Sequence, residues 1–226
     1  MPNGHFKEMP YRSWKPDDPH LAADRFMEIM QQRRSIRSFS SREVPLDLIE
    51  TVIASAGTSP SGANKQPWRF VVIGDPELKR TIRKAAEEEE KLFYAQRASQ
   101  DWLHDLEIIG TDENKPFLEA APWLIAVFKL MKDDRQNVSS EQVYYVNESI
   151  GIAVGMLLAA AQHAGLATLT HTPSPMRFLG DILDRPSYER PYMLIPIGWP
   201  ADDATVPDIE RKPLSEIMVM NRGEQP

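Results

Sequence analysis

The 226-residue chain contains no cysteine. Disulfide bonds, thiolate nucleophiles and cysteine-ligated metals are therefore excluded, and this composition suits a reducing compartment. The five histidines show no HExxH spacing or other ligand pattern, so the sequence predicts no metal site. We expect a cytoplasmic protein.

Long apolar runs are also absent. The longest, residues 150–161, falls short of the ~20 residues that a membrane-spanning helix needs. Residues 1–18 are polar and interrupted by prolines, without the apolar core of a signal peptide. The 26 Lys and Arg residues face 33 Asp and Glu residues, and the net charge of -7 argues against nucleic acid as the main partner. We therefore expect neither a membrane nor a nucleic-acid partner.

The remaining composition is that of a globular protein, with 42% hydrophobic and 26% charged residues. We predict an irregular N-terminal arm at residues 1–20, one domain at 21–220 and a tail at 221–226. Apolar periodicity predicts helices, and continuous apolar runs predict strands covered on both faces. The expected helices span residues 21–32, 45–56, 76–90 with a continuation to 106, 142–164 and 177–184; the expected strands span 70–73, 123–128, 167–172 and 192–197, and residues 214–220 are expected to pack as an extended arm.

One connection between an expected helix and an expected strand is unusually rich in turn-forming residues. Residues 58–68 hold Pro, Gly and small hydroxyl side chains, which let the backbone approach a ligand closely. Gly57 is expected to cap the preceding helix. Loops held between rigid elements often carry binding and catalysis, although an ordinary turn has the same composition.

Two basic clusters point to a bound phosphate. Arg33, Arg34 and Arg37 lie within one and a half helical turns, with the hydroxyl of Ser35 between them. Guanidinium groups match phosphate oxygens and stay charged. Arg211 begins a second cluster that could meet the same phosphate. The alternative is a cationic helix end that complements the helix dipole.

An acidic segment contains a set of groups that complement an amino acid. Glu90 and Tyr94 are one helical turn apart and share a face, and Lys115 lies in the break that follows. The carboxylate suits a substrate ammonium, and the lysine suits a substrate carboxylate. The alternative is a solvated acidic helix face.

Residues 170–172 leave an expected strand as Thr-His-Thr. Thr172 precedes a proline, which favours an extended backbone, and its hydroxyl can donate or accept a hydrogen bond. The alternatives are a threonine that caps its own turn and a histidine without a catalytic role. No GxGxxG motif follows any expected strand, which argues against a Rossmann site for NAD(P).

Together these motifs resemble a known family. Residues 33–37 (RRSIR) and 60–68 (PSGANKQPW) resemble the FMN-dependent nitroreductase superfamily, and residues 87–94, 170–173 and 204–214 are similar to its iodotyrosine deiodinases. The similarity runs from about residue 33 to 219. It implies an α+β, nitroreductase-like fold: a central mixed sheet flanked by helices, in an intertwined homodimer with FMN at the subunit interface. Residues 87–116 would form a lid over the substrate.

The resemblance also implies roles for individual residues. The Thr172 hydroxyl would lie near N5 of the flavin, where it favours the one-electron semiquinone, and the backbone N–H of Ala63 would meet the substrate phenolate. Glu90, Tyr94 and Lys115 would hold the amino-acid zwitterion. The expected FMN contacts are Arg33, Arg34, Ser35, Arg37, Pro60, Ser61, Thr170, His171, Thr172 and Arg211.

The implied reaction is FMN-dependent reductive dehalogenation of halotyrosines, such as iodotyrosine, to tyrosine and halide. A separate reductase, a reduced carrier or NAD(P)H would supply the electrons. Residues 64–66 resemble the wider nitroreductases more than the animal deiodinases, so a general NAD(P)H-dependent nitroreductase or enone reductase is an alternative. In that case Glu90, Tyr94 and Lys115 would be surface charges. A flavin- or amino-acid-binding protein without turnover is a third hypothesis.

Overall fold

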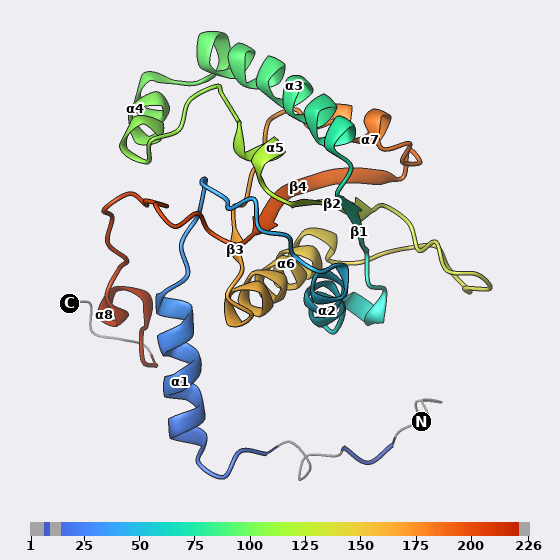
Figure 1. Cartoon of the computed structure of the whole chain (residues 1–226). Helices are drawn as coiled ribbons and strands as arrows, with labels where there is room; N and C mark the ends of the chain where they lie inside the picture. Colours follow the sequence, from blue (N-terminus) through green and yellow to red (C-terminus); the bar gives the residue numbers. More distant parts are fainter. Residues whose placement is uncertain (1–6, 10–14, 222–226) are drawn as a thin grey trace.

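The computed structural model describes residues 7–9 and 15–221 (Figure 1). The parts of the expected arm and tail at residues 1–6, 10–14 and 222–226 lie outside the described residues. The elements are α1 (Pro19–Gln31), α2 (Leu46–Gly57), the 3-10 turn η2 (Gly62–Asn64), β1 (Trp68–Ile73), α3 (Pro76–Leu92), the π turn η3 (Phe93–Arg97), α4 (Gln100–Ile108), α5 (Phe117–Ala120), β2 (Trp123–Leu130), α6 (Val146–His163), β3 (Ala167–Thr168), α7 (Phe178–Ile182), β4 (Glu189–Gly198) and α8 (Leu214–Ile217).

A four-stranded sheet in the order β1-β2-β4-β3 forms the centre, and its neighbouring strands are antiparallel. The parallel element of this mixed sheet is a bridge between Ser35 and Thr168. The backbone N–H of Ile36 donates to the Thr168 carbonyl at 3.1 Å. The first basic motif is thereby attached to the sheet beside β3.

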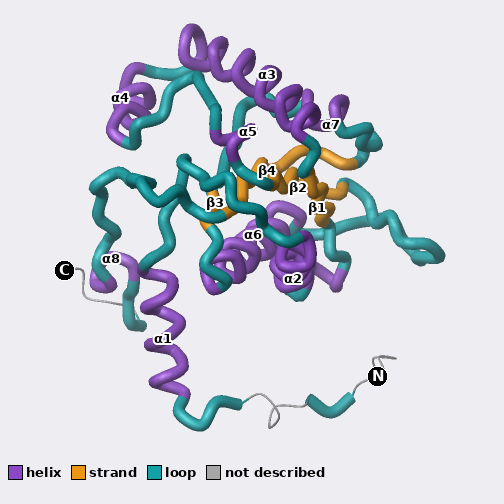
Figure 2. Tube along the Cα trace, viewed as in Figure 1, coloured by secondary structure: helices purple, strands orange, loops and turns teal. Residues whose placement is uncertain are grey.

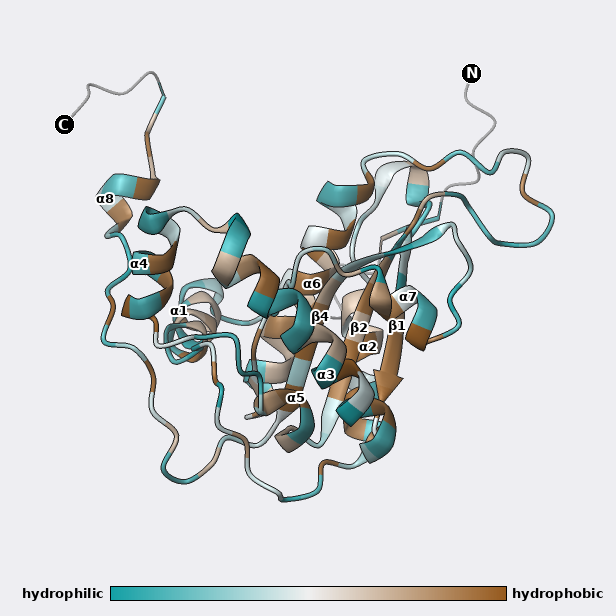
Figure 3. Cartoon of the chain, turned by 90° about the horizontal axis from the view of Figure 1, so that it is seen from above, coloured by the Kyte–Doolittle hydropathy of each residue, from teal (hydrophilic) through white to brown (hydrophobic). Residues whose placement is uncertain are grey.

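Helices cover both faces of the sheet (Figure 2). On one face α2 and α6 bury Ile49, Val52 and Leu157 against the sheet. On the other face α3, α5 and α7 bury side chains such as Ile82 and Leu118. The strands are apolar along most of their length, whereas the outer face of α3 is hydrophilic (Figure 3). This arrangement confirms the expected α+β architecture with a sheet covered on both sides.

Two expected helices differ from the observed ones by more than two residues at one end, whereas the others agree within two residues. The helix that begins at Pro76 does not continue to residue 106: it ends in the π turn η3, and Ala98 is extended with φ -77° and ψ 139°. Ser99 then caps α4, because its side chain accepts from the backbone N–H of Trp102 at 3.2 Å. The helix expected from residue 142 begins at Val146, since Tyr145 adopts a left-handed conformation with φ 48°.

Other expectations also needed correction. Gly57 is the last residue of α2, and Thr58 forms the C-cap in a right-handed conformation. The strand expected at 167–172 is regular only over β3, and His171 continues it as an isolated bridge to Leu194. Residues 214–220 are not fully extended, because they begin with the short helix α8.

Helix α1 and the C-terminal segment stand away from the body of the chain (Figure 1). No residue of α1 is buried, although Phe26 and Met27 are apolar. Ile217 and Val219 of the C-terminal segment are also exposed. Among the described residues, no helix combines the length and the apolar character that crossing a bilayer requires.

Candidate active site

The two predicted basic clusters meet around one cavity of about 260 Å³. The Arg211 guanidinium donates from Nη1 to the Gln31 carbonyl at 3.1 Å and from Nη2 to the Arg33 carbonyl at 2.5 Å. Arg34 donates to the carbonyl of Pro207. These bonds attach the C-terminal segment to the end of α1. The cavity is lined by Arg33, Arg34, Ser35, Arg37, Ile109, Pro207, Ile209, Glu210 and Arg211.

This cavity has an excess of positive charge. Its four arginines face a single carboxylate, Glu210, and none of the ion pairs among the described residues involves these arginines. Burial lowers the pKa of Arg37, an effect that nearby Tyr94 opposes. Guanidinium groups gathered without carboxylate partners fit a phosphate.

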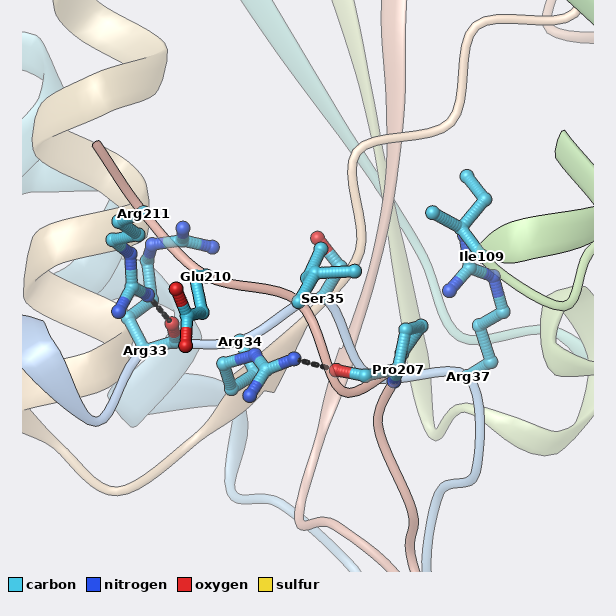
Figure 4. A pocket seen from close by; sticks show the side chains of 9 residues that line it. Arg33, Arg34, Ser35, Arg37, Ile109, Pro207, Glu210 and Arg211 are labelled. Atoms are coloured by element: carbon cyan, nitrogen blue, oxygen red, sulfur yellow. Dashed lines mark hydrogen bonds between the residues drawn. The ribbon is translucent and has the colours of Figure 1, made fainter. Parts of the chain in front are cut away.

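The first cavity shares two lining residues with a second cavity. Figure 4 shows Arg33, Arg34 and Arg211 at one end of the first cavity and Arg37 with Ile109 at the other. Arg37 and Ile109 also line the second cavity, which measures about 240 Å³. The second cavity brings together Glu90, Tyr94, Lys115, Thr170, His171 and Thr172. An elongated ligand with a phosphate at one end could therefore occupy both.

A buried ion pair dominates the second cavity. Lys115 Nζ lies 3.2 Å from Glu90 Oε2, and the two side chains are 3% and 12% exposed. Lys115 also donates to Thr111 Oγ1 at 3.2 Å and lies 5.6 Å from the centre of the Tyr94 ring. Burial raises the pKa of Glu90, while Lys115 opposes that shift. Burial also raises the pKa of Tyr94, whose hydroxyl donates to the Thr111 carbonyl at 3.0 Å.

Local contacts explain how Lys115 reaches this position. Its backbone N–H donates to Glu87 Oε1 at 2.7 Å, and Arg83 holds the same carboxylate at 2.7 Å. The carboxylates of the acidic run on α3 therefore differ in their contacts. Glu87 accepts from the backbone N–H of Lys115, Glu90 pairs with the Lys115 ammonium, and Glu88 is exposed. The alternative of a fully solvated acidic face does not describe this helix.

His171 is buried in the wall of the second cavity. Its backbone exchanges two 2.9 Å hydrogen bonds with Leu194, and its ring lies edge-on to Phe117 at 5.5 Å. Nε2 has no hydrogen-bond partner among the described residues. Burial, followed by the charges of Lys115 and Arg37, lowers the pKa of His171 to about 3. A buried nitrogen without a partner at a cavity wall fits a polar group on a ligand.

Aromatic side chains that the motifs did not single out line the same cavity. Phe93 and Trp102 contact each other edge-on, with ring centroids 4.8 Å apart. They flank the break between α3 and α4, a feature that helical periodicity did not reveal. Their presence within an otherwise acidic segment was the available signal. They give the cavity an apolar wall suited to an aromatic ligand.

The predicted site residues of the loop at residues 58–68 lie outside both cavities. Pro60, Ser61 and Ala63 line neither cavity. The loop instead packs beside the start of α6, where a Cβ added to Gly62 would approach Tyr144 at 3.0 Å. Within one chain, the other predicted site residues line the two cavities, and Pro60, Ser61 and Ala63 do not.

Comparison with known proteins identifies the family. The model of the nitroreductase family matches residues 30–199. Iodotyrosine deiodinase of Haliscomenobacter hydrossis is 50% identical over 207 residues, which cover 92% of this chain and 93% of that protein. The chain belongs to the nitroreductase family, among the iodotyrosine deiodinases.

Further iodotyrosine deiodinases extend this relationship. Iodotyrosine deiodinase 1 of Homo sapiens is 46% identical over 198 residues, covering 86% of this chain and 68% of the human protein. The crystal structure of oxidized iodotyrosine deiodinase bound to FMN and 3-iodo-L-tyrosine superimposes with a TM-score of 0.72 at 31% identity. The superposition covers 84% of this chain and 96% of the chain in that crystal structure. The family fold is thus present over most of the described residues.

Proposed function

We propose that this protein catalyses the reductive dehalogenation of halotyrosines with FMN as its cofactor. A halotyrosine, two electrons and one proton give tyrosine and a halide ion. The observation that carries the proposal is the cationic cavity that adjoins the buried Glu90–Lys115 pair. A phosphate-bearing cofactor and a zwitterionic substrate would then lie side by side. The iodotyrosine deiodinases to which the chain is related support this pairing.

The first cavity fits the polar end of FMN. Arg33, Arg34, Ser35, Arg37 and Arg211 would hold the phosphate, the ribityl chain and the pyrimidine end, because together they offer charged donors without carboxylate partners. Thr170, His171 and Thr172 would lie along the ring system, with the unpartnered Nε2 of His171 available to a polar atom. Bound FMN supplies the electrons for the reaction.

The second cavity fits the amino-acid end of the substrate. Glu90 binds the ammonium group and Lys115 binds the carboxylate, so each buried charge exchanges one partner for another. Residues 87–116 act as the lid, and Tyr94 closes it over the substrate. Phe93 and Trp102 exclude water from the aromatic ring.

The remaining contact comes from a second copy of the chain. The exposed apolar side chains of α1 and of the C-terminal segment, with Ile152 on α6 (47% exposed), form a surface that a homodimer would bury. Pro60, Ser61 and Ala63 of one copy would then meet the FMN and substrate held by the other. The Ala63 N–H would stabilise the phenolate, which the halogen makes easier to form. A separate reductase, a reduced carrier or NAD(P)H delivers the electrons, and we propose a cytoplasmic location, where such donors are available.

An anaerobic single-turnover experiment tests the reaction. FMN-loaded protein is reduced with dithionite and mixed with 3-iodotyrosine, and flavin reoxidation, iodide and tyrosine are measured together. We expect one iodide and one tyrosine for each flavin reoxidised. A flavin that stays reduced with iodotyrosine but is reoxidised by a nitroaromatic compound would overturn the proposal in favour of a general nitroreductase. Repeating the assay with bromo- and chlorotyrosine defines the halogen range.

Mixed dimers test whether the loop acts across subunits. Lys115→Met removes the ammonium that would bind the substrate carboxylate. Ala63→Pro disables the loop, because proline has no N–H and cannot adopt the φ of 47° that Ala63 has. Each variant alone should be inactive. If the two residues come from different copies, random mixing restores about a quarter of the wild-type sites, since half of the dimers carry one intact site. Mixtures that stay inactive while forming heterodimers would show that one copy supplies both groups.

A further inference from the structure

A buried carboxylate outside both cavities attaches the loop at residues 58–68 to the body of the protein. Asp133 has a side chain that is 1% exposed, and its Oδ2 accepts from Lys65 Nζ at 3.0 Å. Arg135 binds the same carboxylate through Nε at 2.9 Å and Nη2 at 2.7 Å. These contacts, with that of Arg135 the largest, hold the pKa of Asp133 well below its usual range. Lys65 Nζ also donates to the Ser140 carbonyl at 2.9 Å.

The segment that Lys65 anchors has an unfavourable backbone. Ala63, Asn64 and Gln66 have φ angles of 47°, 53° and 49°, a conformation that residues with a Cβ rarely adopt. Such a conformation persists only where surrounding contacts hold it. Side-chain contacts contribute to this: Ser61 Oγ accepts from the Gln66 N–H at 2.9 Å, and Asp133 holds Lys65.

This backbone leaves a pair of adjacent N–H groups available. Among the hydrogen bonds of the described residues, none is donated by the backbone N–H of Gly62 or of Ala63. The next N–H, that of Asn64, donates to the Ser61 carbonyl at 3.0 Å. Successive N–H groups in a turn with a left-handed residue form a concavity that binds anions. Its shape depends on the φ angles that the Lys65 anchor preserves.

We propose that Asp133 is a positioning residue for the phenolate of the substrate, acting through Lys65 on the N–H groups of Gly62 and Ala63. The inference rests on the proposed function, since it assigns a support to the loop that meets the phenolate. Without the carboxylate, Lys65 Nζ keeps only the Ser140 carbonyl. Ala63, Asn64 and Gln66 can then relax toward right-handed conformations. The N–H groups then no longer point at one anion.

Two ligands that differ only at the phenol separate positioning from general damage. The ligands are 3-iodotyrosine and 3-iodophenylalanine, which lacks the hydroxyl but keeps the zwitterion. Binding to oxidised, FMN-loaded protein is measured by the quenching of flavin fluorescence. Asp133→Asn should weaken iodotyrosine binding about tenfold, as expected for one charge-assisted hydrogen bond, and leave iodophenylalanine binding and FMN affinity unchanged. Asp134→Asn is the matched control, because Asp134 pairs with Arg69 instead.

Lys65→Met tests the same link in a second way. It removes the anchor while Asp133 remains paired with Arg135, so the variant tests the proposal even where Asp133→Asn folds poorly. We expect the same selective loss, and no further loss in the double variant, because both changes break one connection.

Three outcomes would overturn the inference. Iodotyrosine binding that is unchanged in Lys65→Met would remove the link. An equal loss of both ligands would show general disruption of the loop rather than positioning of an anion. Wild-type protein that binds neither ligand would overturn the proposed function together with this inference, so the two failures are distinguishable.

Discussion

Acidification should destabilise this protein through one buried imidazole, that of His171. The side chain is 8% exposed, and its pKa falls from 6.5 to about 3 in the folded chain. The unfolded chain therefore binds a proton near pH 6.5 that the folded chain does not bind until about pH 3. Stability is highest above pH 6.5 and decreases as the pH falls through this window, at 1.36 kcal/mol for each pH unit.

The magnitude follows from these two pKa values. Between pH 7 and pH 5 the loss attributable to His171 is about 2 kcal/mol, and between pH 7 and pH 3 it is about 4 kcal/mol. His171→Phe removes the titrating group and keeps a planar ring against Phe117. The backbone hydrogen bonds to Leu194 do not depend on the side chain. The variant should lose about 2 kcal/mol less than the wild type over the same pH interval.

Urea denaturation followed by far-ultraviolet circular dichroism measures this difference. Both proteins are studied without FMN and at one protein concentration, because ligand and subunit binding also shift stability. Glu90 acts in the opposite sense, because its pKa is raised in the folded chain. Its contribution to stability is fully present below the unfolded pKa and is lost as the pH rises through the folded pKa. The difference between variant and wild type cancels this and other common contributions. Equal pH slopes for the two proteins would refute the assignment to His171.

Three further predictions concern single side chains. Glu90→Gln should weaken halotyrosine binding about tenfold or more, measured by flavin fluorescence quenching, while the exposed control Glu88→Gln should leave it unchanged. Lys79→Met should lower the free energy of unfolding by about 1–3 kcal/mol in urea titrations, because the buried ammonium donates to backbone carbonyls at 2.7 and 3.0 Å that would lose their donor. Gly198→Ala should destabilise by at least about 2 kcal/mol, since its Cβ would lie 2.4 Å from a proline ring, whereas Gly57→Ala, with open space, should not.

The fold was predictable where local chemistry and tertiary packing agree. The apolar runs at 70–73, 123–128 and 192–197 are the cores of β1, β2 and β4, because a buried strand must be apolar on both faces. The left-handed Tyr145 that delays α6 could not be predicted. No local preference of tyrosine favours that conformation, so its position depends on contacts with the rest of the chain.

For the candidate site, the sequence predicted which chemical groups take part but not how they are arranged in space. Helical spacing selected Glu90 and Tyr94 from an acidic run, and both line the second cavity. Spacing carried no information on which carboxylate would fix the backbone of Lys115, a task that falls to Glu87. The depth of His171 was equally hidden, because burial of a strand-end residue depends on the helices packed over it.

We expect the arrangement of charge in the second cavity to select for amino-acid substrates. Glu90 and Lys115 neutralise each other at 3.2 Å in a site that is nearly closed to solvent. A ligand with a single charge would take one of them and leave the other buried without a partner, at a cost of several kcal/mol. A zwitterion supplies both opposite charges at once, so neither side chain loses its compensation. Halogenated phenols that keep only the amine or only the carboxylate of the amino acid should therefore bind poorly, and we expect the ion pair to discriminate against them before any chemistry begins.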